Sequence, residues 1–286
     1  MISGQRTFTT DYRPAGARRQ GYATYRFRKL IAKNCPAFAN RWYAWKEKRL
    51  LSIRDKLITD IGLSVQAGPF CGMKYISTAH GSALLPKILG TYEEALHPFI
   101  YRVLKRNYQL IADIGCAEGY YAVGFARAFR KIPVQAFDID PQARTLCRKL
   151  AEVNGLADLV SITDNCTIDV LNKILVDSTL IISDCEGYEF DLLRPELIPK
   201  LSSSDLIVEL HDLTHPTICE VITNRFEETH QVSLITNAAV DQSRSIALES
   251  LSWLDRRLAR SEWRGPGNWA YLESKAVSSG FGSTRR

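Results

Sequence analysis

Two glycines and two acidic residues lie close together in LIADIGCAEGYYAVGFAR, residues 110–127. Asp113 lies in an apolar run, and Gly115 and Gly119 bracket the turn that follows it. Glycines permit a tight turn and a close approach of the next helix, whose free N–H groups face a ligand. A pyrophosphate site would want three glycines, whereas Asp113 and Glu118 repel a pyrophosphate and suit a cationic ligand. An ordinary turn between a strand and a helix is the alternative.

A second acidic position follows in VQAFDIDP, residues 134–141. Asp138 ends an apolar run about twenty residues after the glycine turn, where a carboxylate accepts hydrogen bonds from both hydroxyls of a ribose. Asp140 competes for that role. However, an Asp directly before Pro141 also suits the cap of a helix, so Asp138 is favoured for the ribose.

Asp164 and Asn165 close a third apolar run and are placed to meet an adenine amino group, although a helix cap before Thr167 is an alternative. A ligand with a ribose, an adenine and a cationic end is S-adenosylmethionine (SAM), which carries a sulfonium and an ammonium. The expected cofactor-binding residues are Asp113, Gly115, Cys116, Ala117, Glu118, Gly119, Asp138, Asp164 and Asn165.

Acids and a histidine end two further apolar runs. Asp184 and Glu186 lie in LIISDCEGYEFDLL, and His211 ends LIVELH. At the carboxyl ends of neighbouring strands, these three residues are candidates for catalysis, because an imidazole is a good general base near neutral pH. Their alternative roles are helix capping for the acids and a structural role for the histidine. A divalent metal on Asp184, Glu186 and either His211 or Asp212 also stays open, although we expect no metal.

The elements that position these residues alternate between strand and helix. Short apolar runs separated by helical patterns indicate a parallel sheet covered on both faces. Predicted strands are 109–114, 133–137, 159–162, 179–183 and 205–210, with two more at 230–236 and 268–273. Predicted helices are 39–61, 96–104, 120–130, 141–154, 167–175, 190–199 and 246–259.

These segments together resemble the FkbM-type branch of the class I SAM-dependent methyltransferases. The resemblance rests on DIGCAEGYY, AFDIDP, the Asn154–Gly155 pair, SDCEGYE and IVELH, and it spans about residues 108–212. It implies a doubly wound, mostly parallel seven-stranded α/β sheet of Rossmann-like type. It also implies that the 113–119 turn holds the methionine moiety, that Asp138 holds the ribose, and that Asp184 and Glu186 face the transfer site. The chain departs from the branch in having Asp138 where Glu is frequent, and Cys116-Ala117-Glu118 where Ala-Asn-x is frequent.

Members of this branch typically methylate hydroxyls of sugars, glycans or natural products, so we expect an O-methyltransferase acting on such an acceptor. No Asn/Asp-Pro-Pro-Tyr/Phe element follows the fourth predicted strand, which argues against methylation of a base amine. From this we expect no nucleic-acid partner, although aromatics interleaved with Arg in residues 22–45 keep an RNA-directed role open. A non-catalytic binding module with a basic arm is a further alternative.

Charge divides the chain unevenly. Residues 1–60 carry 14 Lys and Arg against 4 Asp and Glu, whereas the remainder carries 23 against 27. This asymmetry fits a basic arm for a phosphate-rich polymer, a membrane surface or an acidic substrate. It also fits a partly disordered leader followed by a solvated amphipathic helix. Trp42, Tyr43 and Trp45 look like packing residues, which favours the second interpretation.

The predicted organisation is a disordered basic leader (1–20), an N-terminal helical extension (21–107), a methyltransferase domain (108–275) and a flexible tail (276–286). No apolar run reaches the ~20 residues that span a membrane. Seven scattered cysteines with no C-x-x-C pair argue against a disulfide framework and a zinc site. We therefore expect a cytoplasmic protein.

Overall fold

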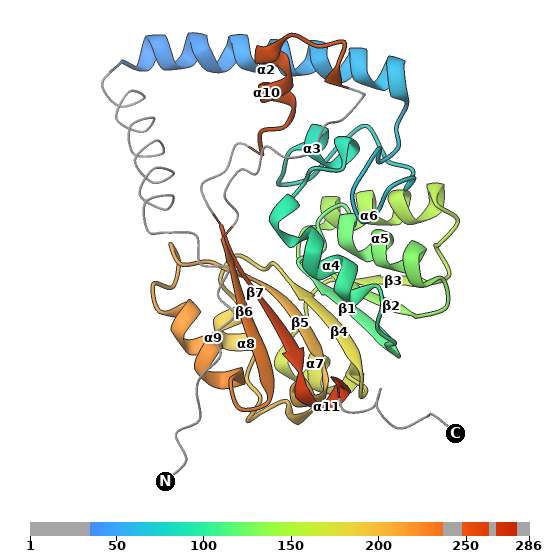
Figure 1. Cartoon of the computed structure of the whole chain (residues 1–286), viewed down its shortest axis with the longest axis vertical. Coiled ribbons are helices and arrows are strands. Elements are labelled where there is room, and N and C mark those ends of the chain that lie inside the picture. Colours follow the sequence, from blue (N-terminus) through green and yellow to red (C-terminus); the bar gives the residue numbers. More distant parts are fainter. Residues whose placement is uncertain (1–34, 237–247, 263–266, 279–286) are drawn as a thin grey trace.

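The computed structural model describes residues 35–236, 248–262 and 267–278. A seven-stranded sheet in the order β3-β2-β1-β4-β5-β7-β6 forms its centre (Figure 1). Its strands are β1 (Leu110–Ile114), β2 (Val134–Phe137), β3 (Val160–Thr163), β4 (Thr179–Ser183), β5 (Asp205–Leu210), β6 (His230–Thr236) and β7 (Asn268–Ser274). β1 to β5 are parallel, and β7 runs antiparallel between β5 and β6. The predicted doubly wound α/β sheet is confirmed, and every predicted strand agrees to within one residue at each end.

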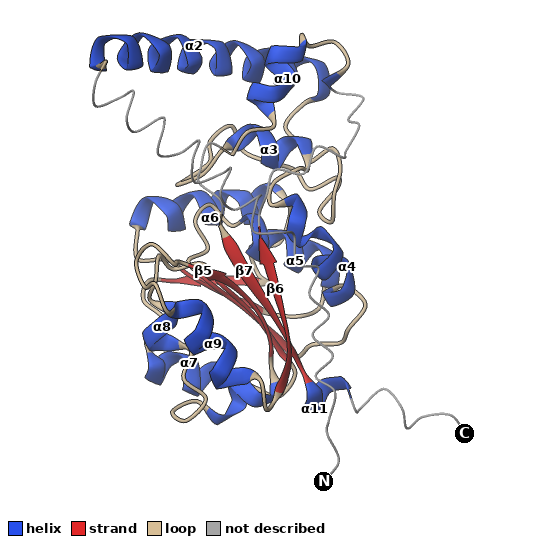
Figure 2. Ribbon diagram, turned by 60° about the vertical axis from the view of Figure 1, so that its left-hand side comes forward, coloured by secondary structure: helices blue, strands red, loops and turns tan. Residues whose placement is uncertain are grey.

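Helices cover both faces of the sheet. Figure 2 shows α4, α5 and α6 on one face and α7, α8 and α9 on the other. The helices are α2 (Pro36–Ile61), α3 (Leu84–Leu89), α4 (His97–Val103), α5 (Tyr120–Phe129), α6 (Pro141–Val153), α7 (Ile168–Ile174), α8 (Glu189–Leu192), α9 (Ile218–Phe226), α10 (Trp253–Ala259) and α11 (Lys275–Ser278), with 3₁₀ turns at Glu94–Leu96 and Pro199–Ser203.

The central strands β1, β4 and β5 are apolar runs because each is buried on both sides. Successive side chains of a strand point to opposite faces. Ile111 and Ile182 accordingly join the core beneath α5 and α6, whereas Ala112 and Ile181 join the core beneath α7 and α9. All four side chains are fully buried. Burial on both faces explains why the sequence shows unbroken apolar runs here and no alternation with polar residues.

The segment ahead of the sheet shares its core. Phe70 packs edge-on against Tyr120 and Phe125 of α5, with ring centroids 5.3 and 5.1 Å apart. A Cβ on Gly124 would lie 2.7 Å from the Phe70 ring, so this glycine admits the ring to the helix surface. Residues from Val65 onward therefore belong to the same hydrophobic core as β1. The predicted boundary at residue 108 stays a prediction, but it would divide this core.

A smaller core lies beyond the sheet, where α2 crosses α10 and α3 (Figure 1). Leu57 and Leu89 are fully buried there, and Arg49 forms a salt bridge of 2.6 Å with Asp255. The prediction that Trp42, Tyr43 and Trp45 are packing residues is wrong, because their exposed fractions are 45%, 48% and 41%. These aromatics lie on the part of α2 that extends past this core.

Three helix predictions differ from the structure. The helix predicted over 39–61 begins earlier, at Pro36. The helix predicted over 190–199 stops at Leu192, because Pro195 disfavours helical backbone at the residue before it. The helix predicted over 246–259 begins only at Trp253, with Ser252 as its N-cap, and residues 246–247 lie outside the described ranges. The leader 1–20 and most of the tail also lie outside them. In the described part of the chain, no helix is long and apolar enough to cross a membrane.

Candidate active site

A cavity of about 820 Å³ opens at the carboxyl ends of the parallel strands. It lies where the strand order reverses, between β1 and β4, which is where open α/β sheets bind ligands. Of the residues singled out from the sequence, those that line the cavity are Asp113, Gly115, Cys116, Ala117, Asp138, Asp164, Asn165, Asp184, Glu186 and His211. Glu118 and Gly119 do not line it.

The two glycines of the β1–α5 turn allow close contact between parts of the protein. Gly115 has a φ of +83°, and a Cβ there would lie 1.8 Å from the carbonyl oxygen of Asp184. Gly119 has a φ of +94°, and its Cβ would lie 2.6 Å from Sγ of Cys147 on α6. The first glycine therefore lets the β1 and β4 loops touch, and the second lets α6 approach.

Asp138 holds the turn in place. Its carboxylate accepts hydrogen bonds from the backbone N–H of Ala117 (2.9 Å) and of Asp140 (2.8 Å). Carboxylate oxygens accept more than one bond each, so Asp138 still has acceptor capacity toward the cavity. Asp140 caps α6 by accepting from Gln142 N at 2.7 Å, which confirms the capping interpretation.

Asp113 is the most deeply buried acid at the cavity, with 2% of its surface exposed. Its Oδ2 atom is buried without a hydrogen-bond partner in the described residues. Burial raises the pKa of Asp113 to about 7, and the charges of Asp184 and Asp138 add to the effect, against a hydrogen bond from Ala122 N–H. Burying a carboxylate without a partner costs free energy, so a cationic ligand beside Asp113 would stabilise its ionised form.

Glu118 points away from the cavity. Its side chain is fully buried and accepts hydrogen bonds from Lys87 Nζ (2.5 Å), Tyr75 Oη (2.6 Å) and His80 N (3.1 Å). Burial raises the pKa of Glu118, but Lys87 and Tyr75 outweigh it, so the pKa lies below its usual value. The structure thus places the Glu118 carboxylate in a junction with the segment ahead of the sheet. The sequence signal for this junction was the lone lysine in the apolar run LLPKIL.

Asp164 and Asn165 follow β3 at the cavity's rim. The cap of α7 is Thr167 itself, whose Oγ1 accepts from Val170 N at 3.3 Å. Asp164 and Asn165 are therefore not needed as that cap. Their position at the rim is compatible with the predicted contact to an adenine.

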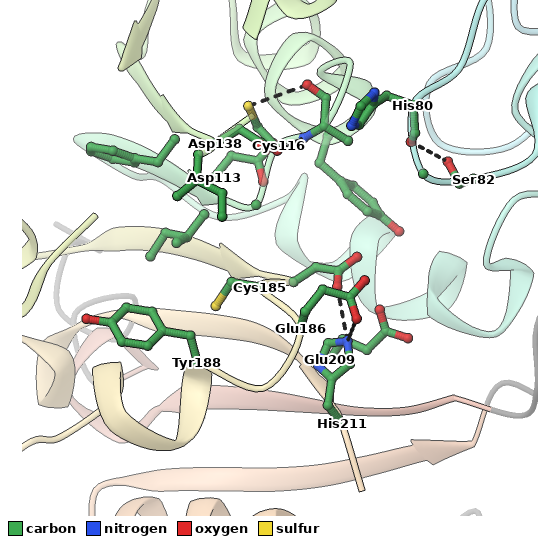
Figure 3. A pocket seen from close by; sticks show the side chains of 18 of the residues that line it. His80, Ser82, Asp113, Cys116, Asp138, Cys185, Glu186, Tyr188, Glu209 and His211 are labelled. Atoms are coloured by element: carbon green, nitrogen blue, oxygen red, sulfur yellow. Dashed lines mark hydrogen bonds and ion pairs between the residues drawn. The ribbon is translucent and has the colours of Figure 1, made fainter. Parts of the chain in front are cut away.

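The candidate catalytic residues converge beside β4 and β5. His211 Nε2 lies 3.6 Å from an oxygen of Asp184 and 3.6 Å from an oxygen of Glu186 (Figure 3). Glu186 has 91% of its side chain exposed, whereas His211 has 15%. Burial lowers the pKa of His211, but Glu189, Asp184 and Glu186 together raise it above the usual value.

Glu189 is a functional residue that the sequence analysis missed. Its carboxylate is fully buried and accepts from Cys185 N (2.6 Å) and Gly187 N (2.8 Å), which fixes the loop after β4. Its Oε1 atom also lies 3.4 Å from His211 Nδ1. The acid that supports the start of α8 is therefore Glu189, a role predicted as the alternative for Asp184 and Glu186.

A metal could use part of this cluster. Ligand atoms of Asp184, Glu189 and His211 lie within 4.8 Å of one another. Glu189 thus takes the place expected of Glu186 in a metal set. Asp212 is held at the sheet edge, where Asn268 Nδ2 donates to its carboxylate.

Comparisons with known proteins agree with the fold. No family model matches this sequence. A curated relative, the release factor glutamine methyltransferase of Dictyoglomus turgidum, is 29% identical over 98 residues, which is 33% of this chain and 35% of that protein. The match thus spans about a third of the relative's length.

Several solved structures resemble the chain in fold alone. A human methyltransferase 10 domain containing protein has 14% identity and a TM-score of 0.44, covering 80% of this chain and 97% of its own. The B. subtilis tRNA methyltransferase TrmK has 14% identity and a TM-score of 0.40, covering 65% and 69%. A putative rRNA-methylase from Clostridium thermocellum has 11% identity and a TM-score of 0.43, covering 65% and 96%.

The expectation of no nucleic-acid partner is contradicted, because structures similar to this chain include tRNA and rRNA methyltransferases. The fold, the site and the curated relative together support a class I SAM-dependent methyltransferase, with SAM as the implied cofactor.

Proposed function

We propose that this protein is a SAM-dependent O-methyltransferase of the FkbM-type branch. The observation that carries the proposal is His211, which lines the cavity and is surrounded by the carboxylates of Asp184, Glu186 and Glu189. A histidine in this position is suited to take a proton from a hydroxyl. It stands at the end of β5, across the strand-order reversal from the glycine turn after β1.

The residues present fit SAM. The buried, unpaired Oδ2 of Asp113 suits the ammonium of the cofactor's amino-acid end. Asp138, after β2, retains acceptor capacity for the ribose hydroxyls. Asp164 and Asn165 line the cavity, and we assign them to the adenine. When bound, SAM supplies a methyl carbon that is open to in-line attack. The chain's own contribution is alignment, worth of order 7–11 kcal/mol in well-oriented systems, together with a base.

In this proposal, the proton of the acceptor hydroxyl passes to His211. Nε2 of His211 would take the proton of the acceptor hydroxyl as that oxygen receives the methyl group that bound SAM would supply, with S-adenosylhomocysteine as the leaving product. Asp184 and Glu186, each 3.6 Å from Nε2, stabilise the imidazolium that results. Glu189 fixes the ring from the Nδ1 side. A base of this kind contributes roughly two to four decades in rate.

A hydroxyl on a sugar, glycan or natural product is the proposed acceptor. The loop after β4 reads SDCEGYE and contains no Pro-Pro element that would clamp a planar amine. Acids and an imidazole at that edge support removal of a proton from oxygen. A hydroxyl of a nucleic acid satisfies the same chemistry, so RNA belongs among the acceptors to be tested.

Metal-assisted O-methylation on the same fold is the second candidate. The approach of Asp184, Glu189 and His211 within 4.8 Å favours it. An oxygen-bound divalent cation there would polarise the acceptor hydroxyl. Loss of activity in EDTA, with recovery on adding Mg²⁺ or Mn²⁺, would favour this candidate over a metal-free base.

The test is methyl transfer from labelled SAM to a cell extract that has been separated into small-molecule, glycan, RNA and protein fractions. We expect label in a product that resists mild alkali and that mass spectrometry identifies as a methyl ether. Label on a base nitrogen or a protein amide would contradict O-methylation. Binding of S-adenosylhomocysteine with no transfer to any fraction would instead support a non-catalytic module.

We also propose a cytoplasmic location. All seven cysteines are free thiols, and Cys116, Cys147 and Cys166 are buried. Free thiols persist in a reducing compartment. Cell fractionation of a tagged chain tests this location, and recovery with a membrane or secreted fraction would contradict it.

A further inference from the structure

A lysine from outside the sheet lines the cavity. Lys87 lies on the short helix α3, and only 3% of its side chain is exposed. Among the described residues that line the cavity, it is the only Lys or Arg. A buried lysine is rare unless it is paired, and Lys87 is paired with Glu118. The pair accounts for its burial, and its position at the cavity also makes it available to a ligand.

Surrounding groups hold the Lys87 ammonium in one place. Nζ lies 2.5 Å from Oε1 of Glu118, 4.7 Å from the centre of the Tyr92 ring and 5.6 Å from that of Tyr120. An ammonium carries three N–H donors, and the bond to Glu118 uses one of them. The Glu118 carboxylate also accepts hydrogen bonds from Tyr75 and from His80 N. Its negative charge is therefore shared among three donors, and the Lys87 ammonium can also bind a second anion.

A charge of opposite sign lies nearby on β1. Asp113 presents a buried Oδ2 without a hydrogen-bond partner in the described residues. Burial raises the pKa of Asp113 to about 7, and the positive charge of Lys87 offsets part of that rise. Tyr120, whose ring Lys87 faces, is the first residue of the ten-residue helix α5, so the positive end of that helix adds to the field. One side of the cavity therefore offers a cation and the other an unpaired anion.

We propose that Lys87 binds the α-carboxylate of SAM while Asp113 binds its ammonium, so that the pair recognises an α-amino-acid head group. This inference rests on the proposed function. It extends the cofactor site to a residue of the segment ahead of the sheet. It also explains the junction with Glu118, which carries Lys87 against the glycine turn.

Ligand binding by the unmodified protein is the first test. Isothermal titration calorimetry compares SAM with decarboxylated SAM, which keeps the adenosine, the sulfonium and the amine. Loss of a hydrogen bond to a charged partner typically weakens binding about ten- to 150-fold. We expect decarboxylated SAM to bind more weakly by that factor. Equal affinities would overturn the role of Lys87 and leave the proposed function intact, whereas binding of neither ligand would overturn both.

Variants then assign the effect to Lys87. Lys87→Met should weaken the binding of SAM by about ten- to 150-fold. The affinity for decarboxylated SAM should stay within about two-fold of the wild-type value. Because this change leaves Glu118 buried without its cation, the double variant K87M/E118Q removes both charges and should show the same loss of discrimination. Lys87→Arg should retain a preference for SAM, and Lys74→Met, an exposed lysine of the same segment, should behave as wild type. A double variant that still discriminates fully between the ligands would overturn the proposal.

Discussion

Nδ1 of His211 lies 3.4 Å from Oε1 of Glu189, and this pair joins the end of β5 to the loop after β4. Glu189 binds that loop through Cys185 N and Gly187 N as well. One buried carboxylate thus fixes both the position of the imidazole and the backbone that carries Asp184. The raised pKa of His211 has its largest favourable contribution from this carboxylate.

Replacing Glu189 by Gln should lower the pKa of His211. A histidine base is active when neutral, so the rate should rise with pH through a pKa above the usual value of about 6.5. Removing the Glu189 charge should move that limb to lower pH. The pKa of His211, followed by NMR titration, measures the shift without knowledge of the acceptor.

Glu186→Gln is the matched control for this shift. Glu186 also faces His211, but 91% of its side chain is exposed, so water screens its charge. The pKa of His211 should fall less in this variant than in Glu189→Gln. An equal or larger fall would contradict the role assigned to Glu189.

Gly115→Ala should destabilise the fold. The added Cβ would lie 1.8 Å from the Asp184 carbonyl oxygen, so the β1 and β4 loops must separate. Overpacking of this kind typically costs about 1–3 kcal/mol, which corresponds to a fall in Tm of about 2–12 °C. Thermal unfolding measures it. Gly155→Ala, which also has a positive φ but no atom within 4 Å, isolates the backbone strain and should cost less.

Asp138→Ala should weaken the binding of S-adenosylhomocysteine by about ten- to 150-fold. The change removes the proposed acceptor for the ribose hydroxyls and leaves Ala117 N–H without its partner. Asp140→Ala is the comparison, since it removes the cap of α6 and a 3.3 Å contact with His80 Nε2 but leaves Asp138 in place. That variant should lose about 1 kcal/mol of stability and keep most of its affinity. A larger loss of affinity in Asp140→Ala would transfer the ribose to Asp140.

Binding of S-adenosylhomocysteine should tighten as pH rises from 5.5 to 7.5. Asp113 has a pKa raised to about 7 without ligand, and an ammonium beside it favours the ionised form and lowers that pKa on binding. Affinity therefore increases as the free protein loses this proton, by up to about 25-fold over the range if Asp113 is ionised throughout in the complex. Asp113→Asn should bind weakly with a flatter profile, and an unchanged slope in that variant would contradict the assignment.

The strands that are buried on both faces of the sheet could be predicted from the sequence. Strands such as Leu110–Ile114 are apolar throughout because they are covered on both faces, so their limits are plain. Ile218–Phe226 was not predicted as a helix, although its buried residues Ile218, Ile222 and Phe226 recur at helical spacing. The segment is short and its apolar residues alternate with polar ones, so its pattern is weaker than that of the strands. Trp42 and Trp45 were expected to pack in the core because they are large aromatics, but both are exposed on α2.

The site residues that lie at the carboxyl ends of strands could be predicted from the sequence. Asp138 and His211 can be identified because each follows the end of an apolar run, and Asp113 because it lies just before the glycine turn. All three line the cavity. Lys87 and Glu189 could not be identified in this way. Lys87 reaches the cavity by a fold-back of the segment ahead of β1, and Glu189 acts by binding backbone N–H groups, which a sequence does not display.

The central claim is that His211 removes a proton during methyl transfer and does not hold the cofactor. His211→Asn tests it directly, with transfer of labelled methyl to the accepting fraction and S-adenosylhomocysteine affinity measured on the same preparation. The account predicts a loss of turnover of about 10²–10⁴-fold with affinity within about two-fold of wild type. Full turnover in His211→Asn, or loss of cofactor binding in parallel with turnover, would contradict it.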